Sequence, residues 1–127
     1  MANNIKKILV VEDEEPIRKV LASALKELKS CDIIEAKDGQ DGLELAIIEH
    51  PDLILLDLIM PKLAGKQVCE KLRADMWGKD VKIIILTNLD SKAEKEDLEK
   101  LNVSDYLVKS SYKLEEVVEK VKNILKI

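Results

Sequence analysis

Five side chains that could bind a metal ion or a phosphate each follow a short apolar run in this sequence. Glu12 and Asp13 follow "ILVV", Asp57 follows "LILL", Thr87 follows "IIIL" and Lys109 follows "YLV". Carboxylates are ligands that suit Mg²⁺, which completes its coordination shell with water and phosphate oxygens. An ammonium group and a hydroxyl group can then neutralise and hydrogen-bond the phosphate. Together these residue types predict a phosphoryl-transfer site, provided that the fold brings them to one place.

Each of these residues, taken alone, also has a purely structural explanation. Glu12–Glu15 precede Pro16, so their carboxylates could simply cap the first turn of a helix. Asp57 and Thr87 could be turn or cap residues, and Lys109 could be one of many solvated lysines. These explanations must all hold independently, whereas one shared sheet edge would account for every residue at once.

The apolar runs themselves predict a parallel sheet that is covered on both sides. Ile8–Val11, Leu53–Leu56, Ile83–Leu86 and the weaker run Tyr106–Val108 are apolar at odd and even positions alike. This pattern is typical of strands buried on both faces. A fifth run, Cys31–Ala36, is more polar and is therefore expected at an edge of the sheet.

Segments with helical periodicity separate these runs. Strands and helices thus alternate five times, which specifies right-handed crossovers and an open α/β sheet with helices on both faces. In such a sheet, ligands bind outside the carboxyl ends of the strands, which is where the five polar residues fall. The helical segments cover residues 17–28, 38–49, 65–75, 90–101 and 114–125.

Length and composition favour a single domain that binds other proteins. The expected domain, 1–127, has 46% apolar and 36% charged residues, a globular balance. A net charge of −4 without a basic stripe argues against binding of nucleic acid. We find no apolar segment typical of a signal peptide or a membrane span, so we expect a cytoplasmic protein with no membrane association. Cys31 and Cys69 belong to no CxxC pair and are expected to be reduced thiols.

The motifs "VVEDE", "DLILLDLIMPKLAG", "IIILTN" and "DYLVKS" occur in this order along the chain. With their spacing, they resemble the receiver domain of bacterial two-component response regulators. The resemblance covers essentially the whole chain. In overall shape the chain most resembles a stand-alone receiver such as the chemotaxis response regulator. It implies a flavodoxin-like (βα)5 fold, an open parallel five-stranded sheet with strand order 2-1-3-4-5 and helices on both faces.

The resemblance also implies how the site would work. Asp57 would accept a phosphoryl group from the phosphohistidine of a histidine kinase or a histidine phosphotransfer protein. Asp13 and Asp57 would bind Mg²⁺ directly, Glu12 would act through water, and the backbone carbonyl of Ile59 would supply a further ligand. Lys109 would pair with one phosphoryl oxygen.

The same resemblance implies a conformational switch. Thr87 would move to hydrogen-bond the phosphoryl group, and Tyr106 would swing inward in response; a simple half-buried strand tyrosine is the alternative interpretation. The protein would then be a phosphorylation-controlled signalling module rather than an enzyme, and it would act on an unknown downstream protein. We expect a monomer, although phosphorylation-dependent dimers occur in the family.

The segment 90–101 is a candidate moving part. Ala93, Leu98 and Leu101 are its only apolar residues for contacts with the core, in a helix otherwise made of charged side chains. A helix with few buried contacts lies at the low-stability end of a structure. We therefore hypothesise that phosphorylation changes partner binding at the face made by this helix, the Tyr106 strand and the last helix. A merely solvated charged helix is the alternative.

Two departures from the family pattern keep other functions open. Ser110 replaces the proline that usually follows the lysine after a cis bond, and a cis bond before a non-proline residue costs about 2.5–4 kcal/mol, so we expect a trans bond or a strained exception. Asn88 replaces a small residue. A phosphorylation-independent docking module is thus the alternative. A magnesium phosphohydrolase is a third possibility, against which stand the missing GxxxxGK[ST] motif and the missing second aspartate after Asp57.

Overall fold

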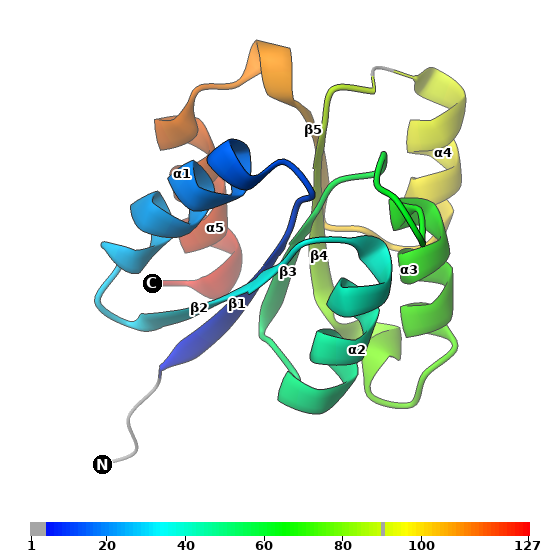
Figure 1. The fold of residues 1–127 in the computed structure, drawn as a ribbon, viewed down its shortest axis with the longest axis horizontal. Helices are drawn as coiled ribbons and strands as arrows, with labels where there is room; N and C mark the ends of the chain where they lie inside the picture. Colours follow the sequence, from blue (N-terminus) through cyan, green and yellow to red (C-terminus); the bar gives the residue numbers. More distant parts are fainter. Residues whose placement is uncertain (1–4, 90) are drawn as a thin grey trace.

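The computed structural model describes residues 5–89 and 91–127 and contains the expected parallel sheet (Figure 1). The five strands are hydrogen-bonded in the order β2-β1-β3-β4-β5, and all four neighbouring pairs are parallel. The predicted fold class and strand order are therefore confirmed, with the more polar run at an edge. The strands are β1 (Lys6–Val11), β2 (Cys31–Ala36), β3 (Leu53–Leu56), β4 (Lys82–Thr87) and β5 (Asp105–Val108).

Helices cover both faces of the sheet, with α1 and α5 on one face and α2, α3 and α4 on the other (Figure 1). This arrangement is what right-handed crossovers produce when consecutive strands lie on either side of the first one. The helices are α1 (Glu15–Lys26), α2 (Gly39–Glu49), α3 (Gly65–Arg73), α4 (Lys92–Lys100) and α5 (Leu114–Leu125), with short 3-10 turns at Gly78–Asp80 and Lys109–Ser111.

The core lies in two layers because successive strand residues point to opposite faces. Leu9 and Ile54 pack in the layer under α2, α3 and α4, whereas Ile8 and Leu53 pack in the layer under α1 and α5. All four are at most 1% exposed. The apolar runs are thus buried on both sides, as their patterns predict, and the sheet is a rigid support for the residues that follow each strand.

Several helix ends differ from the predictions by one or two residues. The first helix spans Glu15–Lys26 rather than 17–28, and the second begins at Gly39, after its N-cap Asp38. The fourth ends at Lys100 rather than at residue 101. The third helix was expected to reach residue 75 but ends at Arg73, since the Asp75 carboxylate accepts the Trp77 and Gly78 N–H groups and closes a turn instead. The fourth begins at Lys92 after Ser91, whose hydroxyl accepts the Glu94 N–H, and its predicted start at residue 90 lies outside the described residues.

The fourth helix is held by few apolar contacts, as expected. Leu98 is the one buried residue that α4 contributes to the core among its described positions, while Leu101 packs partly buried just beyond it. In the described segments 5–89 and 91–127, no helix is both long and apolar enough to cross a membrane.

Candidate magnesium and phosphoryl-transfer site

The carboxylates come together because the sheet ladder continues one residue beyond two central strands. The Asp57 N–H donates to the Val11 carbonyl, and the Glu12 N–H donates to the Ala36 carbonyl, each at 3.1 Å. Glu12 and Asp57 therefore leave adjacent parallel strands at the same height. The sequence prediction that they share one sheet edge is borne out by this geometry.

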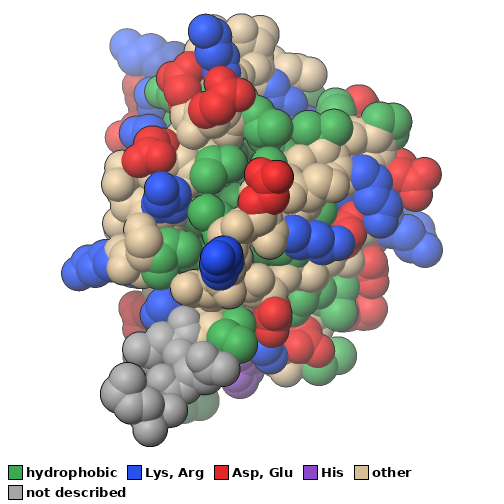
Figure 2. Space-filling model, turned by 90° about the vertical axis from the view of Figure 1, so that its left-hand side faces the viewer, with side chains coloured by type: hydrophobic (Ala, Val, Ile, Leu, Met, Phe, Trp, Pro, Cys, Tyr) green, Lys and Arg blue, Asp and Glu red, His purple; other side chains and the backbone are tan. Residues whose placement is uncertain are grey.

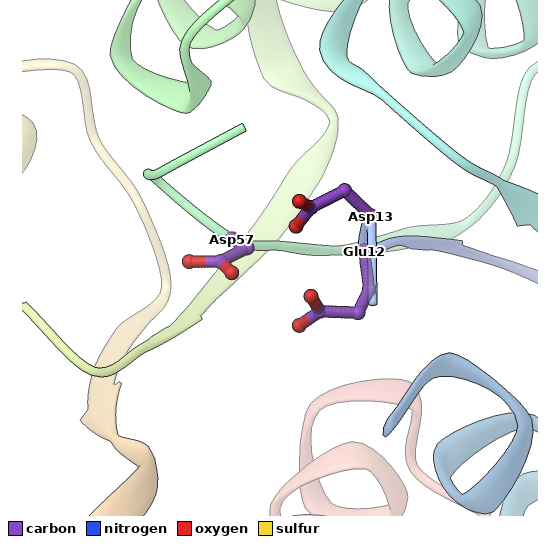
Figure 3. A group of neighbouring side chains, drawn as sticks. All are labelled: Glu12, Asp13 and Asp57. Atoms are coloured by element: carbon purple, nitrogen blue, oxygen red, sulfur yellow. The ribbon is translucent and has the colours of Figure 1, made fainter. Parts of the chain in front are cut away.

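Three carboxylates from two strand ends face a common space (Figure 3). One carboxylate oxygen from each of Glu12, Asp13 and Asp57 lies within 4.8 Å of the others. Glu12 and Asp57 are buried, and Asp13 is the most exposed of the three. An all-oxygen donor set of this spacing fits a hard divalent cation such as Mg²⁺ better than a soft metal.

Lys109 crosses the end of β4 to reach this cluster. Its ammonium group forms an ion pair with the Glu12 carboxylate and lies 3.2 Å from Asp57 Oδ2. Every described peptide bond is trans, including Lys109–Ser110, so the trans alternative is the one adopted. Lys109 begins a 3-10 turn, and its side chain still reaches the phosphoacceptor candidate without a following proline.

The electrostatics of the cluster favour a divalent cation. Burial raises the pKa of Glu12 and outweighs the hydrogen bond from Lys109. Burial lowers the pKa of Lys109, but the hydrogen bond to Glu12 and the charge of Asp57 outweigh it and raise that pKa overall, so the ammonium is retained at neutral pH. By formal charge, three carboxylates against one ammonium leave an excess of two negative charges, which Mg²⁺ would offset.

Thr87 and Tyr106 are joined through the backbone of one loop residue. Thr87, the last residue of β4, is fully buried, and its hydroxyl oxygen accepts the Leu89 N–H at 3.3 Å. The Tyr106 hydroxyl donates to the Leu89 carbonyl. Tyr106 is buried rather than half-buried, at 9% exposure. Thr87 and Tyr106 are thus connected through the backbone of Leu89, a connection that the sequence alone does not reveal.

Ile59 and Lys109 hold the carboxylate of Asp57 in place. The Ile59 N–H donates to Asp57 Oδ1 at 3.3 Å, while Lys109 holds Oδ2. The Ile59 side chain itself is 60% exposed at the rim of the site. Both carboxylate oxygens of Asp57 thus have a hydrogen-bond partner within the protein.

Sequence reasoning missed Arg18, a buried residue of α1. Its guanidinium donates to the backbone carbonyl of Glu12 at 2.9 Å. A signal was present, because Arg18 lies four and seven residues before Ala22 and Leu25 on the buried face of the helix. A charged residue at such a position needs partners inside the protein.

Comparison with known proteins assigns this chain and its fold to one family. The model of the response regulator receiver domain matches residues 8–122, so the chain belongs to the response regulator receiver family. Members of this family are signalling modules of two-component systems. The recognised family and its two-component context, inferred above from the motifs, are therefore confirmed.

Relatives and solved structures agree with this assignment. The chain is 41% identical over 109 residues to a probable transcriptional regulator, ycf27, of Cyanophora paradoxa, covering 86% of this chain and 44% of the relative. It is 41% identical over 121 residues to the alkaline phosphatase synthesis transcriptional regulatory protein PhoP of Bacillus subtilis, covering 95% and 49%. The chain thus spans about half the length of these relatives. The receiver domain of the Francisella response regulator 1452 superposes with a TM-score of 0.85 at 30% identity, covering 95% of this chain and 97% of that chain.

Proposed function

We propose that this chain receives a phosphoryl group on Asp57 in a magnesium-dependent reaction and thereby changes its binding to a partner protein. The observation that carries the proposal is the convergence of the Glu12, Asp13 and Asp57 carboxylates at one place, where the Lys109 ammonium contacts two of them, Glu12 and Asp57. The donor is the phosphohistidine of a histidine kinase or of a histidine phosphotransfer protein. Asp57 attacks phosphorus, an O–P bond forms, and the P–N bond breaks with its electron pair returning to the imidazole.

The residues of the chain divide the work of this transfer. Asp13, Asp57 and the Ile59 carbonyl would hold Mg²⁺, with Glu12 acting through water. Bound Mg²⁺ would supply charge neutralisation for the phosphoryl oxygens. Lys109 supplies a second positive charge, and Asp57 is held in place by the Ile59 N–H and by Lys109. A dissociative transition state requires mainly such positioning and charge, which explains why so few groups suffice.

A protein donor is favoured over an internal one. His50 is the only histidine in the sequence. It lies between the end of α2 and the start of β3, at the amino ends of the strands, whereas the carboxylate cluster lies at their carboxyl ends. The His50 ring stacks on Trp77 with a centroid distance of 4.5 Å. Beside Lys109, an apolar groove of about 380 Å³ runs between α1 and α5, and apolar side chains gather on this side of the molecule among charged ones (Figure 2). This side offers a protein partner a surface next to Asp57.

The test of the proposed function is phosphoryl uptake from a small donor. We expect the protein to take up phosphate from acetyl phosphate in the presence of Mg²⁺, and excess EDTA to abolish the uptake, as followed by phosphate-affinity electrophoresis. Absence of uptake at millimolar Mg²⁺, with the fold intact, would favour the phosphorylation-independent docking module. Steady release of phosphate from a free phosphomonoester would instead favour the phosphohydrolase.

The proposal includes a switch that runs from Thr87 through Leu89 to Tyr106 and α4. Because Thr87 and Tyr106 both hydrogen-bond the Leu89 backbone, a Thr87 hydroxyl that turns to the phosphoryl group would release one of these bonds. The weak apolar anchoring of α4 makes this region the one that responds. The downstream protein would then bind the surface formed by α4, β5 and α5.

Thr87→Ala is expected to separate phosphorylation from this response. The variant still takes up a phosphoryl group, but the change in hydrogen exchange over residues 92–108 that accompanies uptake in the unmodified protein is lost. Ser23→Ala, an exposed hydroxyl on α1, is the matched control and should retain the change. Unchanged exchange in the unmodified protein on phosphorylation would identify α4 as a merely solvated helix.

The remaining expectations about the whole protein stay predictions. A single-domain protein, a monomer that dimerises at most on phosphorylation, and a cytoplasmic location are proposed from the sequence. The relatives named as transcriptional regulators are about twice as long as this chain. For the described domain we propose protein partners and no direct contact with nucleic acid or membrane.

A further inference from the structure

Arg18 is a buried cation that lies behind the carboxylate cluster. It is 9% exposed, and each nitrogen of its guanidinium has a partner. Nη1 donates to the Glu12 carbonyl at 2.9 Å, Nε donates to Glu35 Oε1 at 3.2 Å, and Nη2 pairs with Glu15 at 3.6 Å. Burying a guanidinium is costly unless such partners are provided, so its placement restricts the conformation of every group that it touches.

The bond to the Glu12 carbonyl fixes the peptide plane between two candidate metal ligands. That carbonyl and the Asp13 N–H belong to one planar unit, so holding the oxygen also sets the direction from which the Asp13 side chain leaves the backbone. On the other side of the same residue, the Glu12 N–H is held by the Ala36 carbonyl. Asp13 itself has no hydrogen-bond partner for its carboxylate among the described residues, so its orientation depends on this backbone.

Glu35 anchors the guanidinium from the edge strand β2. Its carboxylate also receives Lys19 at 3.0 Å and Lys26 at 3.9 Å. Burial raises the pKa of Glu35, but the hydrogen bonds from Lys19 and Arg18 outweigh burial and lower it overall, so the anchor remains ionised. Arg18 is thus held at both ends, by a carboxylate on β2 and by a carbonyl at the end of β1.

We propose that Arg18 is a positioning residue for the magnesium site, which orients the Glu12–Asp13 peptide without touching the metal or the phosphoryl group. The inference rests on the proposed magnesium site. A positioning role also predicts the direction in which the Mg²⁺ affinity changes when Arg18 is replaced. If the positive charge of Arg18 acted only through space, its removal would tighten the binding of a cation, whereas loss of positioning weakens that binding. Partners that orient metal ligands change metal affinity by about 10- to 100-fold when removed.

The test measures Mg²⁺ affinity by NMR titration of backbone amide signals, at a temperature where each variant is folded. We expect Arg18→Met to bind Mg²⁺ about 10-fold more weakly than the unmodified protein. Arg18→Lys keeps the charge but loses the planar fork, and it should also bind more weakly. It also serves as the test variant if Arg18→Met does not fold.

Arg73→Met is the matched control. Arg73 is also partly buried and donates to backbone carbonyls, those of Leu101, Gly78 and Val81, but it lies at the end of α3 far from the cluster along the fold. This control should lose stability and keep its Mg²⁺ affinity. Unchanged or tighter Mg²⁺ binding in both folded Arg18 variants would overturn the inference about Arg18 and leave the proposed magnesium site standing. Failure of the unmodified protein to bind Mg²⁺ would overturn the proposed site and the inference with it.

Discussion

Lys109→Met is expected to lower the free energy of unfolding of the metal-free protein by about 3 kcal/mol, the lower end of the cost of breaking a buried ion pair. The substitution leaves the buried carboxylates of Glu12 and Asp57 without the ammonium that contacts both. Mg²⁺ should recover part of the loss, because a ligand that binds the folded state stabilises it and the cluster without its ammonium attracts the cation more strongly than in the unmodified protein. Denaturant unfolding at pH 7, with and without Mg²⁺, measures both effects.

The loss of unfolding free energy in Lys109→Met should change with pH in a defined direction. The pKa of Glu12 is already raised by burial, and removal of Lys109 takes away a hydrogen bond that lowers it. Between the unfolded and the folded pKa of Glu12, the folded state binds more protons, so stability rises as the pH falls through this window. The deficit of Lys109→Met should therefore shrink as the pH falls from 7 toward the unfolded carboxyl pKa, about 4.3 for Glu.

A surface ion pair provides the control for this prediction. Lys120 lies 3.0 Å from Asp105 with its side chain 40% exposed, and an exposed pair of this kind contributes about 0–1 kcal/mol. Lys120→Met should therefore change stability little, and its small difference from the unmodified protein should be the same with and without Mg²⁺. A Lys109→Met variant that is as stable as this control, or a deficit that grows as the pH falls, would contradict the account of the cluster.

Gly65→Ala is expected to destabilise the protein by about 3 kcal/mol, the upper part of the usual range for overpacking. A Cβ atom at this position would lie 2.3 Å from the Asp57 carbonyl oxygen and 2.8 Å from the Leu58 Cα, both backbone atoms. The Gly65 N–H also donates to the Leu58 carbonyl at 3.0 Å, so the start of α3 cannot move away without losing this bond. The same displacement would shift Asp57, and phosphoryl uptake should fall with stability.

The sign of this effect is informative because helix propensity predicts the opposite. Alanine in a helix is favoured over glycine by about 1 kcal/mol, so propensity alone would make Gly65→Ala more stable. Glu70→Ala, at an exposed position of the same helix, is the control and should lie within about 0.5 kcal/mol of the unmodified protein. Unfolding curves for the three proteins decide the matter, and a stabilised Gly65→Ala would show that the close approach is not rigid.

Sequence periodicity was sufficient for the sheet and for the residues at its edge. Strands such as Leu53–Leu56 are apolar on both faces, and parallel strands necessarily place their following residues at one edge, so Glu12, Asp13 and Asp57 could be brought together by pattern alone. The reach of Lys109 could not, because it depends on a side chain that crosses β4 and on the path of a turn without proline.

Features that depend on tertiary contacts escaped the pattern. Arg18 was hidden within an otherwise regular amphipathic helix, and its carbonyl contact at Glu12 requires knowledge of the packing of α1 against β1 and β2. The link of Thr87 and Tyr106 through Leu89 depends on the path of the β4–α4 loop. The stacking of His50 on Trp77 joins two residues far apart in the chain, which no local sequence pattern predicts.

The most direct test of the central claim is the intact mass of the protein after incubation with Mg²⁺ and acetyl phosphate. Asp57→Asn removes the proposed acceptor, and Asp52→Asn is the matched control, because Asp52 precedes the same strand and accepts the Lys7 N–H at its other end. We expect a gain of one phosphoryl group in the unmodified protein and in Asp52→Asn, and none in Asp57→Asn. Equal gain in Asp57→Asn, or no gain in the folded unmodified protein, would contradict the assignment of Asp57 as the phosphoacceptor.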